Sequence, residues 1–290
     1  MTDFSRYLIA SDLDGTFFDK TAHPASANLK ALARYRAGGG LFTIATGRVY
    51  HALPLTIPGI DKMLNAPAVL CNGTYLYDFA TNTSYHEQCF SPELAKELMH
   101  FVETSFPDVP IIGCAREGLY YANPGEDLLQ YIQTHNPEFR HACPMREWPT
   151  IHWHKLVMTL DAKRAPLCRK QIQNHFGVRL GITTSSPPIL ELQLPNISKA
   201  TGLAQLHHLS EKTRGRLLIA CGDYENDLEM LRAADIAVCP ANACDAVKEI
   251  ADYVLCDHNE GVIADLIAQL EAGRITPKKE AHNEHPRCII

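Results

Sequence analysis

Carboxylates follow an apolar run near the start of the chain, in the segment SDLDGT at 11–16. Asp12 and Asp14 come directly after YLIAS, which is predicted to be a buried strand. Two carboxylates one residue apart can face the same way at a strand end, with Leu13 turned into the fold, and Gly15 permits the chain to turn sharply. Such a pair can bind a hard cation and divide the roles of nucleophile and acid/base.

A second acidic group stands in CGDYENDLEM at 221–230, after the predicted strand RLLIAC. Asp223 is placed at the strand end, and Asn226 and Asp227 follow one turn later. Because open α/β sheets bind ligands at the carboxyl ends of their strands, these oxygen ligands could converge with Asp12 and Asp14 on one magnesium ion.

Two further residues could bind an anionic group. Thr46 in ATGR follows the predicted strand LFTIA, where its hydroxyl and nearby backbone N–H groups can donate to phosphoryl oxygens. Lys199 in NISKATGL begins a helical pattern and can neutralise phosphoryl charge, although an isolated lysine at a helix start is more often simply exposed.

These segments belong to two regions with the same βαβ rhythm, which predicts an α/β fold with a three-layer core and a mostly parallel sheet. Residues 1–82 and 187–274 are assigned to this core. Helices and alternating strands over 83–186 predict an inserted α+β cap, and turn residues at 81–84 and 183–188 mark its edges. Residues 275–290 are polar and aperiodic and are predicted to be a flexible tail.

The composition is that of a globular protein, with 46% hydrophobic and 21% charged residues in 290. A net charge of −6 argues against binding nucleic acid through bulk electrostatics. We expect no signal peptide and no membrane span, and therefore a cytoplasmic protein whose scattered cysteines are reduced.

The order Asp-x-Asp, Thr, Lys, Gly-Asp-x-x-Asn-Asp resembles the haloacid dehalogenase-like superfamily, and more closely its Cof-type branch, whose large cap lies between the second and third motifs. CNGTYLYD at 71–78 and ELQLPNISKATGL at 191–203 are similar to further segments of that branch. Ala200 and the segment CPAN at 239–242 depart from the usual pattern, but at positions that touch no reacting atom.

The resemblance implies a phosphatase in which Asp12 forms an aspartyl-phosphate and Asp14 is the general acid/base. It implies that Thr46 and Lys199 hold phosphoryl oxygens, and that Asp12, the Asp14 carbonyl and Asp223 bind Mg²⁺. Asn226 and Asp227 would position the metal site and Lys199. Further candidates for binding substrate are Gly47, Arg48, Asn72 and Asn242.

The expected substrate is a small phosphorylated metabolite selected by the cap, most commonly a sugar phosphate, with pyridoxal phosphate or flavin mononucleotide close behind. A phosphomutase shares the core and cap type and stays an alternative, as does a non-catalytic protein that binds a phosphorylated ligand. The oligomeric state is not predicted.

Overall fold

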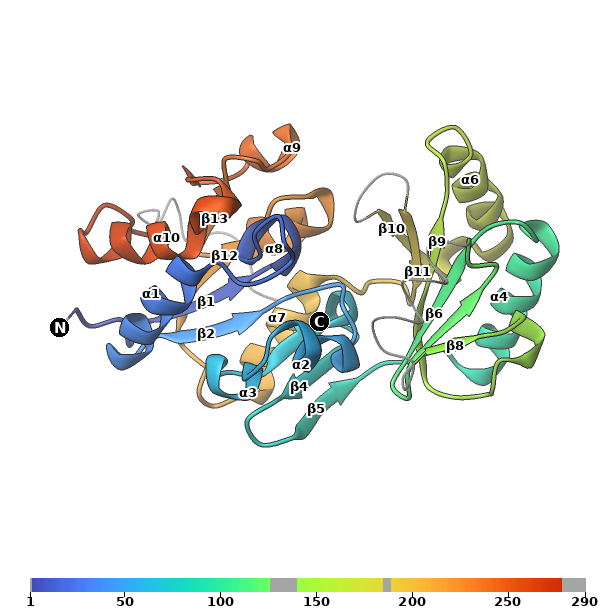
Figure 1. Cartoon of the computed structure of the whole chain (residues 1–290), viewed down its shortest axis with the longest axis horizontal. Helices are drawn as coiled ribbons and strands as arrows, with labels where there is room; N and C mark the ends of the chain where they lie inside the picture. The colour runs from blue at the N-terminus through green and yellow to red at the C-terminus, as the bar shows by residue number, and fades with distance from the viewer. Residues whose placement is uncertain (1, 126–139, 185–188, 278–290) are drawn as a thin grey trace.

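The chain forms two bodies joined by two crossing segments (Figure 1). The computed structural model describes residues 2–125, 140–184 and 189–277. We call the body with the five-stranded and three-stranded sheets the core, and the body with the six-stranded sheet the cap. Within these ranges no helix has the length and apolar character needed to cross a membrane.

The core strands are β1 (Tyr7–Ser11), β2 (Leu41–Ile44), β3 (Ala68–Leu70), β4 (Tyr75–Asp78), β5 (Thr83–Glu87), β12 (Leu217–Cys221), β13 (Ile236–Pro240) and β14 (Tyr253–Leu255). The cap strands are β6 (Ile111–Ala115), β7 (Leu119–Ala122), β8 (Arg140–Ala142), β9 (Trp153–Thr159), β10 (Gly181–Thr184) and β11 (Ile189–Gln193). The α-helices are α1 (Ser26–Ala37), α2 (Leu53–Thr56), α3 (Ile60–Met63), α7 (Lys199–Leu209), α8 (Leu228–Ala233), α9 (Asp245–Lys248) and α10 (Val262–Glu271) in the core, and α4 (Pro92–Ser105) and α6 (Ala165–Phe176) in the cap.

The main core sheet has the order β14-β13-β12-β1-β2, and its strands are parallel. Successive side chains of a strand point to opposite faces. Ile9 of β1 therefore joins the hydrophobic cluster of α1 and α10, while Leu8 and Ala10 join the cluster of α7 and α8. Burial of both faces is typical of parallel sheets. The predicted three-layer α/β core is confirmed.

The cap sheet has the order β10-β11-β9-β6-β7-β8 and is antiparallel except between β7 and β8. Helices α4 and α6 cover the face that points away from the core (Figure 1). Leu156 and Met158 of β9 belong to that covered face. The alternate residues Lys155 and Val157 therefore face the core.

Two strands lie on the other side of the predicted domain boundaries. β5 pairs with β4 of the core, although residues from 83 onward were assigned to the cap. β11 pairs with β9 and β10 of the cap, although residues from 187 onward were assigned to the core. The reason is that β4 and β5 are adjacent antiparallel strands of one sheet, as are β10 and β11, so both predicted boundaries fall between neighbouring strands. The chain crosses between the bodies after β5 and after β11.

The predicted tail begins later than residue 275, because the Ile275 side chain is only 3% exposed and belongs to the main core cluster. Residues 278–290 lie outside the described ranges.

Helix α7 approaches the loop after β3 closely enough to need two glycines. A Cβ on Gly202 would stand 2.5 Å from Val69 Cγ1 and 2.8 Å from Gly73 Cα. Separations below 3.0 Å require the structure to shift. This contact fixes how deeply the first turn of α7, with Lys199, enters the core.

We expect Gly202→Ala to lower the free energy of unfolding by about 2 kcal/mol, because the added methyl group overpacks the interface. In an open helix the same change would stabilise by roughly 0.5–1 kcal/mol. Chemical denaturation measures the difference, with Gly125→Ala as the control because a Cβ there meets nothing within 4 Å. Equal stability of the two variants would contradict the proposed close contact.

Candidate active site

The predicted catalytic side chains converge at one edge of the core sheet. Asp12, Thr46 and Asp223 follow β1, β2 and β12, which are neighbours in the order β12-β1-β2. Since these strands are parallel, their carboxyl ends meet at the same edge. Lys199 reaches this edge from the first turn of α7, which is capped by Ser198 and Thr201.

Lys199 lies at the centre of the group. Its Nζ is 2.7 Å from Asp12 Oδ1 and 2.7 Å from Asp227 Oδ1, and the lysine is 1% exposed. Burial alone lowers the pKa of the ammonium, but the two adjacent carboxylates outweigh burial and raise the pKa above its usual value. Lys199 is therefore charged and is not the exposed lysine typical of a helix start.

Asp227 is fully buried and accepts three hydrogen bonds. Its Oδ2 accepts from the backbone N–H groups of Asp223 and Tyr224, at 3.0 and 3.2 Å, while Oδ1 accepts from Lys199. These bonds hold the turn after β12 and the lysine together, which is the positioning role that the family resemblance implies.

Asp223 is held in front of the Asp12 loop. Its Oδ1 accepts a 2.6 Å hydrogen bond from the Thr16 hydroxyl. Gly15 has φ +80°, and a Cβ there would stand 2.4 Å from Asp223 Oδ2. Glycine is thus required both for the turn and for the close approach of the carboxylate.

Negative charge is in excess at this edge. Oxygen atoms of Asp12, Asp223 and Asp227 lie within 4.8 Å of one another. Burial raises the pKa of Asp12 well above its usual value. The charge of Lys199 lowers this pKa, whereas the charges of Asp227 and Asp223 raise it further. Burial likewise raises the pKa of Asp223 to about 6. A buried set of hard oxygen donors with surplus negative charge fits a hard divalent cation. Asp12 and Asp223 are the better ligands, since Asp227 already accepts three hydrogen bonds.

Asp14 is not part of this cluster and pairs with Arg48. Its two carboxylate oxygens accept from Arg48 Nε and Nη2 at 2.8 and 2.6 Å. The Arg48 guanidinium also covers the Phe18 ring, 5.0 Å from the centroid. Arg48, which the sequence predicts to bind substrate, lines the cavity and in this structure also contacts the proposed acid/base.

The site opens into a cavity of about 530 Å³ between the core and the cap. Its lining includes seven of the predicted site residues: Asp12, Asp14, Thr46, Gly47, Arg48, Asp223 and Asn226. Lys199 and Asp227 lie behind Asp12.

Asn72 and Asn242, predicted to line the site, are not among the described residues of the cavity wall. Asn72 lies directly behind Gly47 and donates to Glu191 of the cap at 2.6 Å. Asn242 donates to the Gly15 carbonyl at 2.8 Å, so it supports the loop that carries Asp14.

Lys155 and Glu191, which were not predicted as site residues, face the cavity from β9 and β11. The sequence held a signal for both, because each is a charged residue that alternates with apolar residues in its strand. Which face of the cap sheet meets the core was not encoded in that pattern.

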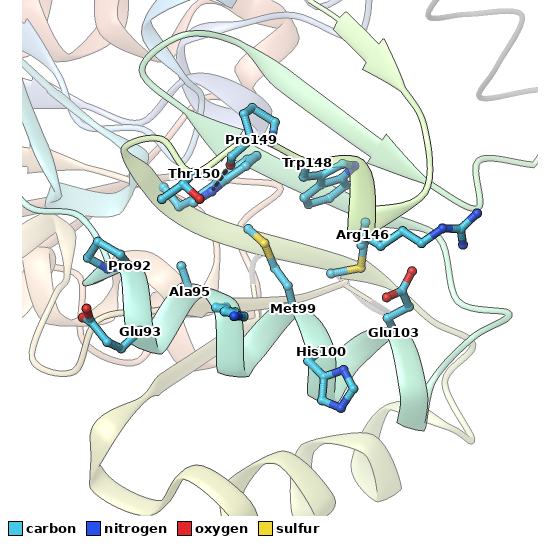
Figure 2. A pocket seen from close by; sticks show the side chains of 13 residues that line it. Pro92, Glu93, Ala95, Met99, His100, Glu103, Arg146, Trp148, Pro149 and Thr150 are labelled. Atoms are coloured by element: carbon cyan, nitrogen blue, oxygen red, sulfur yellow. Dashed lines mark hydrogen bonds between the residues drawn. The ribbon is translucent and has the colours of Figure 1, made fainter.

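A second hollow, of about 640 Å³, lies within the cap between α4 and the segment 145–153 (Figure 2). Met99, Trp148 and Pro149 are among its lining residues, and none of the strand-end carboxylates reaches it. Its chemistry therefore gives no reason to assign it to the reaction.

Comparison with known proteins identifies the family. Residues 9–267 match the model of the haloacid dehalogenase-like hydrolases, and the chain belongs to this family, in agreement with the resemblance of its motifs. The chain is similar to a pyridoxal phosphate phosphatase of Escherichia coli, with 28% identity over 90% of this chain and 97% of the relative. It is 26% identical to a 5-amino-6-(5-phospho-D-ribitylamino)uracil phosphatase of the same organism, over 90% of this chain and 94% of the relative. A solved haloacid dehalogenase-like hydrolase from Bacteroides thetaiotaomicron shares the fold, with a TM-score of 0.77, 22% identity and coverage of 91% and 99%.

We expect Lys199→Met to lower the free energy of unfolding by about 3 kcal/mol in the presence of chelator, because two buried carboxylates lose their cation. Denaturation of the variant beside Lys212→Met, which removes an exposed lysine, measures this loss. A loss of the same size in both variants would show that the buried ammonium does not hold the site together.

Proposed function

We propose that the protein is a Mg²⁺-dependent phosphatase of small phosphorylated metabolites that acts through an aspartyl-phosphate on Asp12. The observation that carries the proposal is the buried array of Asp12, Asp223, Asp227 and Lys199, which opens into a cavity closed by the cap. The named activities of the two Escherichia coli relatives, both phosphatases, support the same reaction class.

In the proposed mechanism Asp12, the Asp14 carbonyl and Asp223 hold Mg²⁺, which when bound offsets the repulsion between the carboxylates and a phosphate dianion. Thr46, the backbone around Gly47 and Lys199 orient the phosphoryl oxygens. An Asp12 carboxylate oxygen attacks phosphorus, the ester P–O bond breaks, and the leaving oxygen takes a proton from Asp14.

In the second step Asp14 removes a proton from water, and the water oxygen attacks phosphorus. The bond between phosphorus and Asp12 then breaks, which releases inorganic phosphate and restores the Asp12 carboxylate. In the structure each Asp14 carboxylate oxygen instead accepts a hydrogen bond from Arg48. The proposal therefore requires Asp14 to exchange Arg48 for the substrate's leaving oxygen when substrate binds.

Phosphate release tests the proposal. We expect wild-type protein with Mg²⁺ to hydrolyse p-nitrophenyl phosphate, and both chelator and Asp12→Asn to lower the rate by at least about 10³-fold, because the nucleophile or its metal is lost. Circular dichroism of Asp12→Asn controls for folding. Absence of release from every phosphate ester, in wild type and variant alike, would overturn the proposal. Transfer of phosphoryl groups that depends on a bisphosphate activator would indicate a mutase instead.

Two esters that differ in their leaving group test whether Asp14 acts as a general acid. We expect Asp14→Asn to lower kcat/KM for an alkyl phosphate by about 10²–10⁴-fold, because kcat/KM reports the step in which the leaving alkoxide must be protonated, and not the later hydrolysis that both esters share. The loss for p-nitrophenyl phosphate should be at least about tenfold smaller, since p-nitrophenolate leaves without a proton. Steady-state kinetics with both esters measures the two losses. Equal losses would assign Asp14 to binding or loop structure, and an unaltered affinity without any turnover would indicate a binding protein.

A further inference from the structure

A second group of potential metal ligands lies where the chain first crosses from the core to the cap. It consists of Glu87, Cys89 and His154, whose ligand atoms all lie within 4.8 Å of one another. Glu87 is the last residue of β5 in the core, Cys89 belongs to the crossing segment that follows, and His154 is the second residue of β9 in the cap (Figure 1). We call these three residues the hinge cluster. None of them is among the described residues that line the cavity at the catalytic edge.

The ligand atoms of the hinge cluster converge on one carboxylate oxygen. His154 Nε2 is 2.7 Å from Glu87 Oε1, and the Cys89 thiol donates to the same oxygen at 3.6 Å. Oxygen, nitrogen and sulfur ligands arranged as a tetrahedron about 2.0–2.3 Å from a zinc ion lie roughly 3–4 Å from one another. Side-chain movements on the order of 1 Å therefore bring the three atoms to the separations of a zinc site.

Contacts outside the hinge cluster hold two of its side chains in place. Arg116 Nε donates to Glu87 Oε1 at 3.0 Å, and Arg116 Nη2 forms an ion pair with Glu87 Oε2. The His154 ring is 2% exposed, stacks on Tyr75 with centroids 5.5 Å apart, and has its Nδ1 3.8 Å from Cys71 Sγ. Histidines and carboxylates that bind metals are oriented in the same way, by partners outside the ligand set.

A hydrogen-bonded connection between core and cap accounts for Glu87, His154 and Arg116, but it gives no reason for Cys89. A thiol is a weak hydrogen-bond donor, so it adds little to such a network. As a thiolate it is instead a strong ligand, and together with imidazole it favours zinc over magnesium or calcium, which prefer oxygen ligands. The combination of Cys, His and Glu around one point therefore indicates a metal other than the one expected at the catalytic edge.

We propose that the hinge cluster binds a zinc ion, with Glu87 Oε1, Cys89 Sγ and His154 Nε2 as ligands and water as the fourth. On binding, the Cys89 thiol releases its proton to solvent and His154 carries its proton on Nδ1, so that the Nε2 lone pair coordinates the ion. Cys89 is half-buried, which lets water reach the fourth position. The inference does not depend on the proposed phosphatase function.

A zinc ion in this place links the core, the crossing segment and the cap. The crossing segment is already attached to the cap by a hydrogen bond from the Phe90 N–H to the Trp153 carbonyl at 2.9 Å. Any movement of the cap relative to the core must be absorbed by the segments that connect them. We therefore expect bound zinc to restrain the movement of the cap.

Metal titration of the reduced full chain tests the site, with excess Mg²⁺ present to compete at the catalytic edge. We expect one Co²⁺ to produce the near-ultraviolet absorption band of a cobalt–thiolate bond, and Zn²⁺ to remove the band by displacement. Cys89→Ala should abolish the band and lower the affinity for Zn²⁺ at least about 10²-fold, because loss of a partner outside the ligand set already costs about 10–100-fold.

Cys143→Ala is the matched control, since Cys143 is another half-buried cysteine of the cap and is not part of the hinge cluster. This variant should keep both the band and the affinity of the wild type. Absence of the band in the wild type, or a band of equal strength in Cys89→Ala, overturns the proposal.

Glu87→Gln covers failure of Cys89→Ala to fold. The change keeps the size of the side chain and removes the charged oxygen ligand, so we expect the cobalt–thiolate band to remain while the affinity for Zn²⁺ falls at least about tenfold. An unaltered affinity in this variant shows that the three residues do not act as one ligand set.

Hydrogen exchange tests the effect on the crossing segment. We expect Zn²⁺ to slow amide exchange of residues 88–91 at least about tenfold in the wild type, because local opening must first release the ion. Cys143→Ala should respond like the wild type, and Cys89→Ala should not respond. Equal exchange with and without Zn²⁺ in the wild type contradicts binding at the hinge cluster.

Discussion

The buried ammonium of Lys199 is the contact on which the arrangement of the active edge depends. It touches Asp12 after β1 and Asp227 after β12, and it enters from α7. Asp227 in turn fixes the backbone that carries Asp223. Three segments far apart in the sequence are therefore held by one charge, because two carboxylates buried this closely repel unless a cation lies between them.

The close approach of backbone segments makes this charge arrangement possible. Gly15 lets Asp223 approach the Asp12 loop, and Gly202 lets α7 seat against the loop after β3. The Thr16 hydroxyl then orients Asp223. Rigid strand ends and a capped helix supply the precision that electrostatic stabilisation of phosphoryl transfer requires, since preorganised groups need no rearrangement during the reaction.

Residues at the contact between cap and core connect the wall of the cavity to the proposed acid/base. Asn72 lies behind Gly47 in the core and bonds to Glu191 of the cap, while Arg48, the next residue of the same loop, holds Asp14. The loop of Gly47 and Arg48 thus lies between the proposed acid/base and the cap side of the cavity. Closure of the cap over substrate and the exchange of Asp14 between partners are accordingly expected to be coupled.

The sequence by itself determined the α/β fold, the family and the residues of the catalytic edge, because these depend on local patterns: an apolar strand followed at once by Asp12, Thr46 or Asp223, and a helix begun by Lys199. Tertiary structure alone decided the rest. The turn residues at 81–84 and 183–188 predicted the edges of the cap, but turn residues alone do not show whether the next strand pairs within the same sheet. Alternation in β9 and β11 set Lys155 and Glu191 opposite their apolar neighbours, yet which face would meet the core depended on how α4 and α6 pack. The pairing of Arg48 with Asp14 likewise arises from long-range proximity, which residue spacing does not encode.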